Sequence, residues 1–81
     1  MEIAVKLFGP LAEVCGHELT VSVEPEAATC AVVRRRLAEA APALADMLPA
    51  CRLAVNGRYA SEEQAIRPGD EVAVIGLVSG V

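Results

Sequence analysis

Residues 70–81 read DEVAVIGLVSGV, and the fold assignment of the whole chain is built around this stretch. The first part alternates apolar and other residues, with Val72 and Val74 on one face, which predicts a half-buried strand over 71–75. The residues after Ile75 are small and have neither the periodicity nor the length of another element. We therefore expect a last strand that leads directly into a flexible C-terminal tail, residues 76–81, with the rest of the chain as its platform.

Two further strands are predicted near the N-terminus. Residues 2–8 alternate with period two, so that one face carries Ile3, Val5 and Leu7 while the other carries Glu2, Ala4, Lys6 and Phe8. Residues 18–24 alternate in the same way. Gly9-Pro10 ends the first strand, since proline has no amide proton for a sheet, and a short helical turn over 10–14 should connect the two strands.

A helix is predicted after the second strand. Thr29 is a suitable N-cap, because its side-chain oxygen can accept a hydrogen bond from a free N–H of the first turn. Behind it, apolar residues recur at spacings of three and four and form one stripe, namely Cys30, Val33, Leu37 and Ala41. Pro42 should end this helix, and a further turn over 43–48 should continue its apolar side.

The second half of the chain predicts more strands joined by short turns. A third strand covers 52–55, and Asn56-Gly57 is a strong hairpin signal because both residues tolerate positive φ. A short return strand over 58–60 and a polar connection over 61–66 should follow. Pro68-Gly69 fits the two central positions of a type II turn, which would start the last strand.

The element order is therefore β-β-α-β-(β)-β, within a single domain over residues 1–81. A helical crossover most often returns the chain parallel to an earlier strand. We expect an α+β fold of the ubiquitin-like β-grasp type: a mixed sheet of four or five strands with one main helix packed on one face.

Composition excludes several classes of protein. The net charge of −4 argues against binding to nucleic acid or to an anionic membrane, since both require clustered basic surface. No apolar stretch reaches the roughly 18–20 residues of a transmembrane helix, and the charged N-terminus does not resemble a signal peptide. The three cysteines form no Cys-x-x-Cys pair, so we expect no metal site and a reducing, cytoplasmic location.

A search for catalytic groups gives no active site. His17 is the only histidine, and general acid–base catalysis would need a partner to hold it, so a surface role is favoured. Cys30 lies on the apolar stripe of the helix, where packing is the favoured role. Cys15 and Cys51 lie near element ends and could be exposed, but neither has a visible base. For Arg34-Arg35-Arg36 a solvated helix face is favoured over contact with an acidic partner.

The second face of the sheet is more informative. Ala4, Phe8, Ala54, Ala73 and Ile75 should all point away from the helix. First and last strands are neighbours in a β-grasp fold, so Phe8 and Ile75 should lie side by side. With Leu77 they would form an exposed apolar patch that leads into the tail, and such patches usually bind a partner. The alternative is a loosely covered sheet face in a small domain.

Several motifs in this order resemble a known family. These are Leu7-Phe8-Gly9 followed by Leu11-Ala12-Glu13, then Leu53-Ala54-Val55-Asn56, then Gly69-Asp70-Glu71-Val72-Ala73, and finally Val78-Ser79-Gly80. Together they resemble the small, sulfur-carrying subunit of molybdopterin synthase, within the ubiquitin-like sulfur-carrier proteins. The thiamine-pathway carriers are similar but usually shorter, so the length favours the molybdopterin branch.

The resemblance implies a specific chemistry. An E1-like enzyme would adenylate the C-terminal glycine carboxylate with ATP, and sulfur would then convert it into a thiocarboxylate. The tail would enter the large subunit of the synthase and give its sulfur to cyclic pyranopterin monophosphate. In this scheme Gly80 is the carrying position, and the chain itself binds no cofactor. The partner contacts would come from Phe8, Ile75, Leu77, Val78 and Ser79.

The tail departs from the pattern of that family. Family tails commonly end in Gly-Gly after two prolines, whereas this chain has Gly76-Leu77 and Gly80-Val81 at those positions, and Ala12 where arginine is common. Val81 places a stiff β-branched side chain beside the terminal carboxylate, so we predict slow or absent adenylation of the chain that ends in Val81. Either Val81 is removed, or the partner enzymes tolerate it, or the chain binds without carrying sulfur.

Two alternative functions therefore remain beside the molybdopterin assignment. One is a β-grasp adaptor that uses the apolar patch only to bind a partner. The other is a sulfur carrier for a different pathway, such as thiamine or cysteine synthesis.

Overall fold

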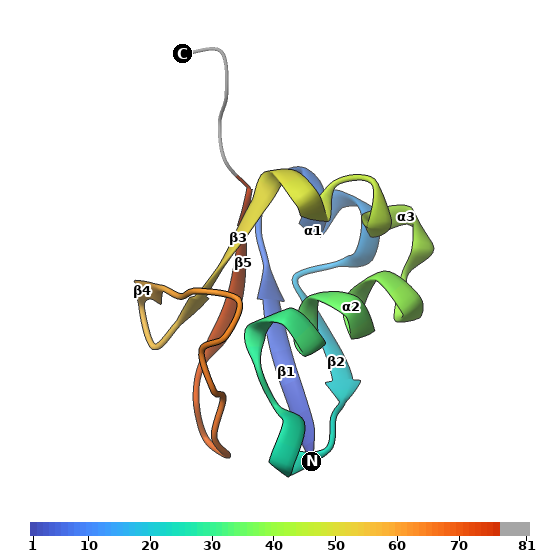
Figure 1. Cartoon of the computed structure of the whole chain (residues 1–81). Helices are drawn as coiled ribbons and strands as arrows, with labels where there is room; N and C mark the ends of the chain where they lie inside the picture. Colours follow the sequence, from blue (N-terminus) through green and yellow to red (C-terminus); the bar gives the residue numbers. More distant parts are fainter. Residues whose placement is uncertain (77–81) are drawn as a thin grey trace.

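A mixed sheet of five strands forms one layer of the protein, and the helices cover one of its faces (Figure 1). The computed structural model describes residues 1–76. In spatial order the strands are β2 (Glu18–Ser22), β1 (Glu2–Leu7), β5 (Val72–Gly76), β3 (Cys51–Val55) and β4 (Arg58–Tyr59). The helices are α1 (Pro10–Cys15), α2 (Cys30–Ala40) and α3 (Pro42–Ala45), with 3-10 turns η1 (Pro25–Ala27) and η2 (Leu48–Ala50).

The strand pairing confirms the β-grasp prediction. β1 is antiparallel to β2 and parallel to β5, while β3 is antiparallel to both β5 and β4. The expectation that the crossover returns the chain parallel to an earlier strand is wrong for β3, the strand that follows the helices. After α2, the α3 and η2 turns carry the chain to the end of the sheet where β1 stops, so β3 runs back in the opposite direction (Figure 1). The parallel neighbour of β1 is β5.

The core lies between the inner face of the sheet and α2. Alternation in β1 is as predicted, because Ile3, Val5 and Leu7 are buried while the residues between them are exposed. On α2 the apolar stripe of Cys30, Val33 and Leu37 is fully buried against the sheet. Each aliphatic side chain buried in this way contributes roughly 1.5–3 kcal/mol to the free energy of unfolding.

The start of α2 is held by a side-chain cap and by the loop between β4 and β5. The N–H of Val32 donates to Oγ1 of Thr29 at 3.3 Å, which confirms the predicted N-cap. The N–H groups of Cys30 and Ala31 donate to carbonyls of the loop over 61–66, at 3.1 and 2.9 Å. These bonds satisfy N–H groups that have no partner within the helix. Ile66 is therefore buried in the core, although the sequence analysis treated 61–66 as a polar connection.

Both predicted turns, Asn56-Gly57 and Pro68-Gly69, are present in the structure. Asn56 and Gly57 have φ values of 53° and 83°, as the hairpin requires. The N–H of Asp70 donates to the carbonyl of Arg67 at 3.0 Å, which closes the turn through Pro68-Gly69.

The last strand is shifted by one residue toward the C-terminus relative to the predicted range 71–75. β5 includes Gly76, which pairs with Cys51, so the segment expected as a tail over 76–81 begins with a strand residue. The remaining tail positions, 77–81, lie outside the described residues. Among the helices of residues 1–76, none has the length and apolar character needed to span a membrane.

Candidate functional site

The outer face of the sheet, opposite α2, carries an apolar hollow of about 440 Å³. It is lined from four strands or their ends, by Lys6, Phe8, Ala54, Gly57, Tyr59, Glu71, Ala73 and Ile75. The strand register explains this grouping, because Lys6 pairs with Ala73 and Ala54 pairs with both Ala73 and Tyr59. We call this hollow and its lining residues the outer-face hollow.

The predicted apolar patch coincides with this hollow. Phe8, Ala54, Ala73 and Ile75 all line it, so the prediction that Phe8 and Ile75 lie together on the outer face is confirmed. Ala4 is exposed but does not line the hollow. Leu77, Val78, Ser79, Gly80 and Val81, which the sequence placed in the partner contact or at the carrying position, lie outside the described residues.

Two aromatic side chains stand at the rim of the outer-face hollow. Phe8 is 50% exposed and Tyr59 is 57% exposed, and between them lie the small side chains of Ala54 and Ala73. Small central residues between large rim residues create a concave apolar surface. Such a surface is suited to receive a protruding side chain of another protein.

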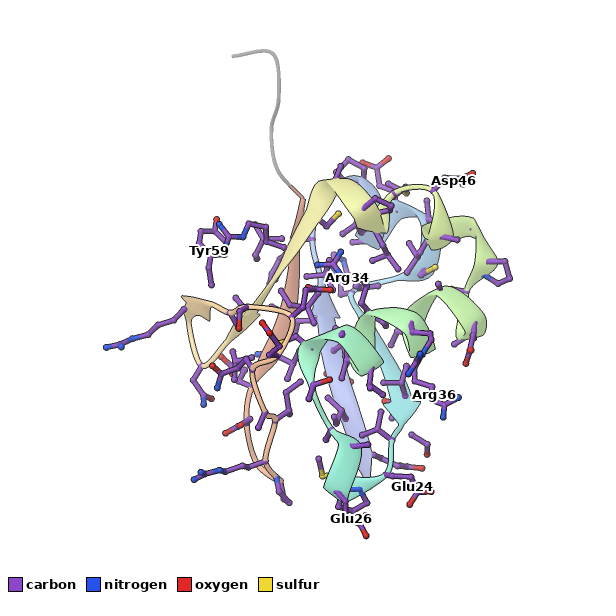
Figure 2. The ribbon with its side chains drawn as sticks, in the orientation of Figure 1. Glu24, Glu26, Arg34, Arg36, Asp46 and Tyr59 are labelled. Atoms are coloured by element: carbon purple, nitrogen blue, oxygen red, sulfur yellow. The ribbon has the colours of Figure 1, made fainter. Side chains whose placement is uncertain are left out.

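The rim also carries charged groups. Lys6 Nζ lies 3.1 Å from Glu71 Oε2, and both side chains are largely exposed. The guanidinium of Arg52 lies over the ring of Tyr59, 4.8 Å from its centroid (Figure 2 labels Tyr59). A cation–π contact at an exposed site contributes roughly 0.5–1 kcal/mol, enough to favour one orientation of the ring.

Hydrogen bonds between the two turns fix the end of the sheet next to the hollow. The side-chain amide of Asn56 donates to Asp70 Oδ1 at 3.0 Å, and Asn56 Oδ1 accepts from the N–H of Glu71 at 2.9 Å. The N–H of Arg67 donates to the second carboxylate oxygen of Asp70 at 2.8 Å. Both hydrogen bonds lower the pKa of Asp70, and the bond from the backbone of Arg67 contributes more than the bond from Asn56.

Comparison with known proteins identifies the family. The ThiS family model matches residues 5–80, nearly the whole chain. The protein belongs to the ThiS family. It is therefore a ubiquitin-like protein of the sulfur-carrier type. No curated protein sequence matches the chain.

Solved structures of similar proteins agree with this assignment. SAMP1 from Haloferax volcanii is 31% identical over the full length of both chains, with a TM-score of 0.86. A putative molybdopterin converting factor subunit 1 from Pyrococcus furiosus is 22% identical, with a TM-score of 0.83 over 96% of this chain and 99% of its own. The Helicobacter pylori complex of molybdopterin-converting factor subunits 1 and 2 gives 18% identity over both full lengths and a TM-score of 0.70. The last two matches show that the fold is shared.

Other candidate groups of this ThiS-family protein have structural roles. Cys30 is buried, as predicted, but Cys51 is buried as well, which corrects the expectation that it could be exposed. The Cys51 thiol donates to the carbonyl of Met47 at 3.2 Å, and burial raises the pKa of both thiols. A raised pKa disfavours the reactive thiolate. His17 is exposed, and within residues 1–76 no three His, Cys, Asp or Glu side chains are grouped to hold a metal ion.

Arg34 differs from the solvated residue that the sequence predicted. Its Nε and one terminal nitrogen each lie 3.1 Å from the carboxylate of Glu62, and it also donates to the backbone carbonyls of Leu48 and Cys51. Because α2 passes close to η2 and to the loop over 61–66, the guanidinium joins three segments that are distant in sequence. Arg35 is exposed as expected, and Arg36 pairs with Glu39 at the surface.

Sequence reasoning also missed Tyr59 and Arg52 as parts of the site. The hairpin signal could have found them: with Asn56-Gly57 as its turn, Tyr59 must lie opposite Ala54, on the face that carries Phe8. Arg52 is two residues before Ala54 and therefore on the same face.

Proposed function

We propose that this protein is the sulfur-carrier subunit of a molybdopterin synthase. In this role its C-terminal thiocarboxylate would donate sulfur to cyclic pyranopterin monophosphate. The observation that carries the proposal is the family match, which extends through Gly80, the position expected to carry sulfur. The outer-face hollow, with Phe8 and Ile75, supports it by offering a docking surface on the strand that leads into the tail.

The chemistry of this role needs no catalytic side chain from the carrier. An E1-like partner would use ATP to form an acyl adenylate at the C-terminal carboxylate, with release of pyrophosphate. A sulfur nucleophile would then displace AMP and leave a thiocarboxylate. After transfer of the sulfur in the large subunit, hydrolysis would restore the carboxylate. The chain itself supplies the terminus and the surface that docks on the two cytoplasmic partners.

Intact mass spectrometry tests the proposal. The chain would be incubated with the E1-like enzyme, ATP and a sulfide source, in one form that ends in Val81 and one that ends in Gly80. We expect the Gly80 form to gain the mass of one oxygen-to-sulfur exchange, and the Val81 form to do so slowly or not at all. If neither form gains this mass while both bind the large subunit, the protein is an adaptor and the proposal is wrong.

A second candidate function is that of a protein modifier. It is favoured by one observation: the SAMP1 structure, described as a small archaeal modifier protein, is 31% identical, against 22% and 18% for the molybdopterin converting factors. An experiment that distinguishes the two functions incubates the chain with the E1-like enzyme, ATP and a cell extract, without a sulfide source. A modifier forms adducts with other proteins that survive denaturation and thiol reductants, whereas a dedicated sulfur carrier forms none.

A further inference from the structure

Arg52 borders the outer-face hollow at the end of the sheet where β5 leads into the tail. It pairs with Ile75 in the antiparallel register of β3 and β5, and residues opposite each other in such a pair have their side chains on the same face. The next outer-face position of β3 is Ala54, which lines the hollow. Arg52 is therefore a cation beside the apolar surface and close to the start of the tail.

Within residues 1–76, Arg52 has no carboxylate partner. The ion pairs and charged side-chain hydrogen bonds of this part of the chain use three other cations, namely Lys6, Arg34 and Arg36. The guanidinium of Arg52 instead lies over the ring of Tyr59, 4.8 Å from its centroid. Stacking uses the flat face of the guanidinium, whereas its N–H donors lie in the plane of the group. These donors stay available to a ligand.

The charges of the outer face are separated between its two sides. The strands place two cations on this face, Arg52 and Lys6, and Lys6 is paired with Glu71 at 3.1 Å. Glu18 lies opposite Lys6, and Glu2 is four residues before Lys6 on the same strand, so both carboxylates are on the outer face as well. Neither carboxylate is in an ion pair within the described part of the chain.

The outer face is therefore positive near β3 and negative near β2. These strands are on opposite sides of β1 and β5 (Figure 1). A carboxylate of a partner would be attracted to Arg52 and repelled from Glu2 and Glu18. This arrangement of charges fixes the orientation in which the partner docks.

We propose that Arg52 is a specificity-determining residue of the docking surface. The partner is a protein that presents an apolar side chain to the outer-face hollow and an Asp or Glu next to it, and Arg52 donates two hydrogen bonds to this carboxylate. The planar guanidinium matches a carboxylate in this bidentate geometry. Stacking on Tyr59 holds the guanidinium in place before binding, so less rotamer freedom is lost when the partner docks.

This inference rests on the proposed function, because the partner used to test it is the molybdopterin synthase large subunit. Calorimetry at two salt concentrations would give the Kd of wild type, Arg52→Gln and Arg52→Lys. The matched control is Arg58→Gln, which removes the same charge from an exposed arginine of the neighbouring strand β4. Arg58 pairs with the buried Val55, so its side chain is on the opposite side of the sheet from the outer-face hollow.

We expect Arg52→Gln to raise Kd roughly ten- to thirtyfold at low salt, because it removes charged hydrogen bonds and leaves the carboxylate of the partner unpaired. Arg52→Lys keeps the charge without the planar fork and should raise Kd about two- to fivefold. Arg58→Gln should change Kd less than about twofold. In a Tyr59→Leu background the effect of Arg52→Gln should be smaller, since the guanidinium is no longer held by the ring.

The salt dependence distinguishes a direct contact from a structural role. The Kd of wild type should rise with salt, and Arg52→Gln should lose most of this dependence. A purely structural role of Arg52 would leave the salt dependence unchanged and would overturn the inference. Thermal unfolding of each variant verifies that the fold is intact.

Two outcomes separate the inference from the function on which it rests. If the wild-type chain binds the large subunit but Arg52→Gln and Arg58→Gln have the same Kd, the role of Arg52 is overturned and the proposed function stands. If the wild-type chain does not bind the large subunit at all, the proposed function fails, and the inference fails with it. If the chain alone forms dimers that Arg52→Gln abolishes, the occupant of the hollow is a second copy, and the choice of partner is overturned.

Discussion

Replacement of Phe8 by alanine should weaken binding to the large subunit much more than it destabilises the fold. A phenylalanine that becomes fully buried covers about 150–250 Å². Since Phe8 is 50% exposed, roughly 75–125 Å² remain for a partner to cover. At about 25 cal/mol per Å², this area corresponds to about 2–3 kcal/mol, or a roughly 30- to 150-fold increase in Kd. It is an upper value, because an interface seldom covers the whole side chain.

The matched control for this experiment is Val14→Ala. Val14 is 49% exposed, but it lies on α1 and does not line the outer-face hollow. Isothermal titration calorimetry with the large subunit gives both Kd values, and urea unfolding shows that both variants remain folded. If Phe8→Ala binds as tightly as Val14→Ala, the docking surface lies elsewhere, and the reasoning from the outer face is refuted.

Three further predictions concern stability and reactivity. Arg34→Ala should lower the free energy of unfolding by about 2–3 kcal/mol, because charged hydrogen bonds to two backbone carbonyls and a carboxylate are lost, whereas Arg35→Ala should change it little in the same urea titration. Asp70 has a lowered pKa in the folded state, so its stabilisation is present above the pKa of the unfolded state, about 4, and is lost as the pH falls through the lower folded-state pKa. Asp70→Asn should therefore flatten the decline of the melting temperature as the pH falls below about 4. Iodoacetamide at neutral pH should modify the half-buried Cys15 within minutes, while the two buried thiols react only after unfolding, as intact mass over time would show.

Most of the fold could be predicted because its elements follow simple periodicities. Alternation over 2–8 and 18–24, the apolar stripe behind Thr29 and the Asn56-Gly57 turn each correspond to an observed element. Such local signals depend on neighbouring residues alone. The direction of β3 does not follow from a local signal. It depends on the end of the sheet at which α3 and η2 place the start of β3 relative to β1.

The incorrect predictions for Arg34 and Ile66 have the same cause, since both depend on contacts between segments that are distant in sequence. Arg34 looked like a solvated residue because its partners are Glu62 and two backbone carbonyls, all at least 14 residues away in sequence. Ile66 looked like part of a polar connection because its burial depends on the loop packing beside the start of α2. Tyr59, by contrast, could have been assigned to the outer face from the hairpin register alone.

The division of the sheet into two faces separates stability from binding in this protein. The inner face and α2 supply the buried aliphatic residues, so substitutions there act on folding. The outer face leaves Phe8 and Tyr59 about half exposed, so these two side chains contribute little that folding requires. Changes of partner can therefore arise on the outer face at small cost in stability, which accounts for one β-grasp scaffold in both a protein described as a modifier and molybdopterin converting factors. For this chain, the outer-face hollow is accordingly where partner choice should be sought.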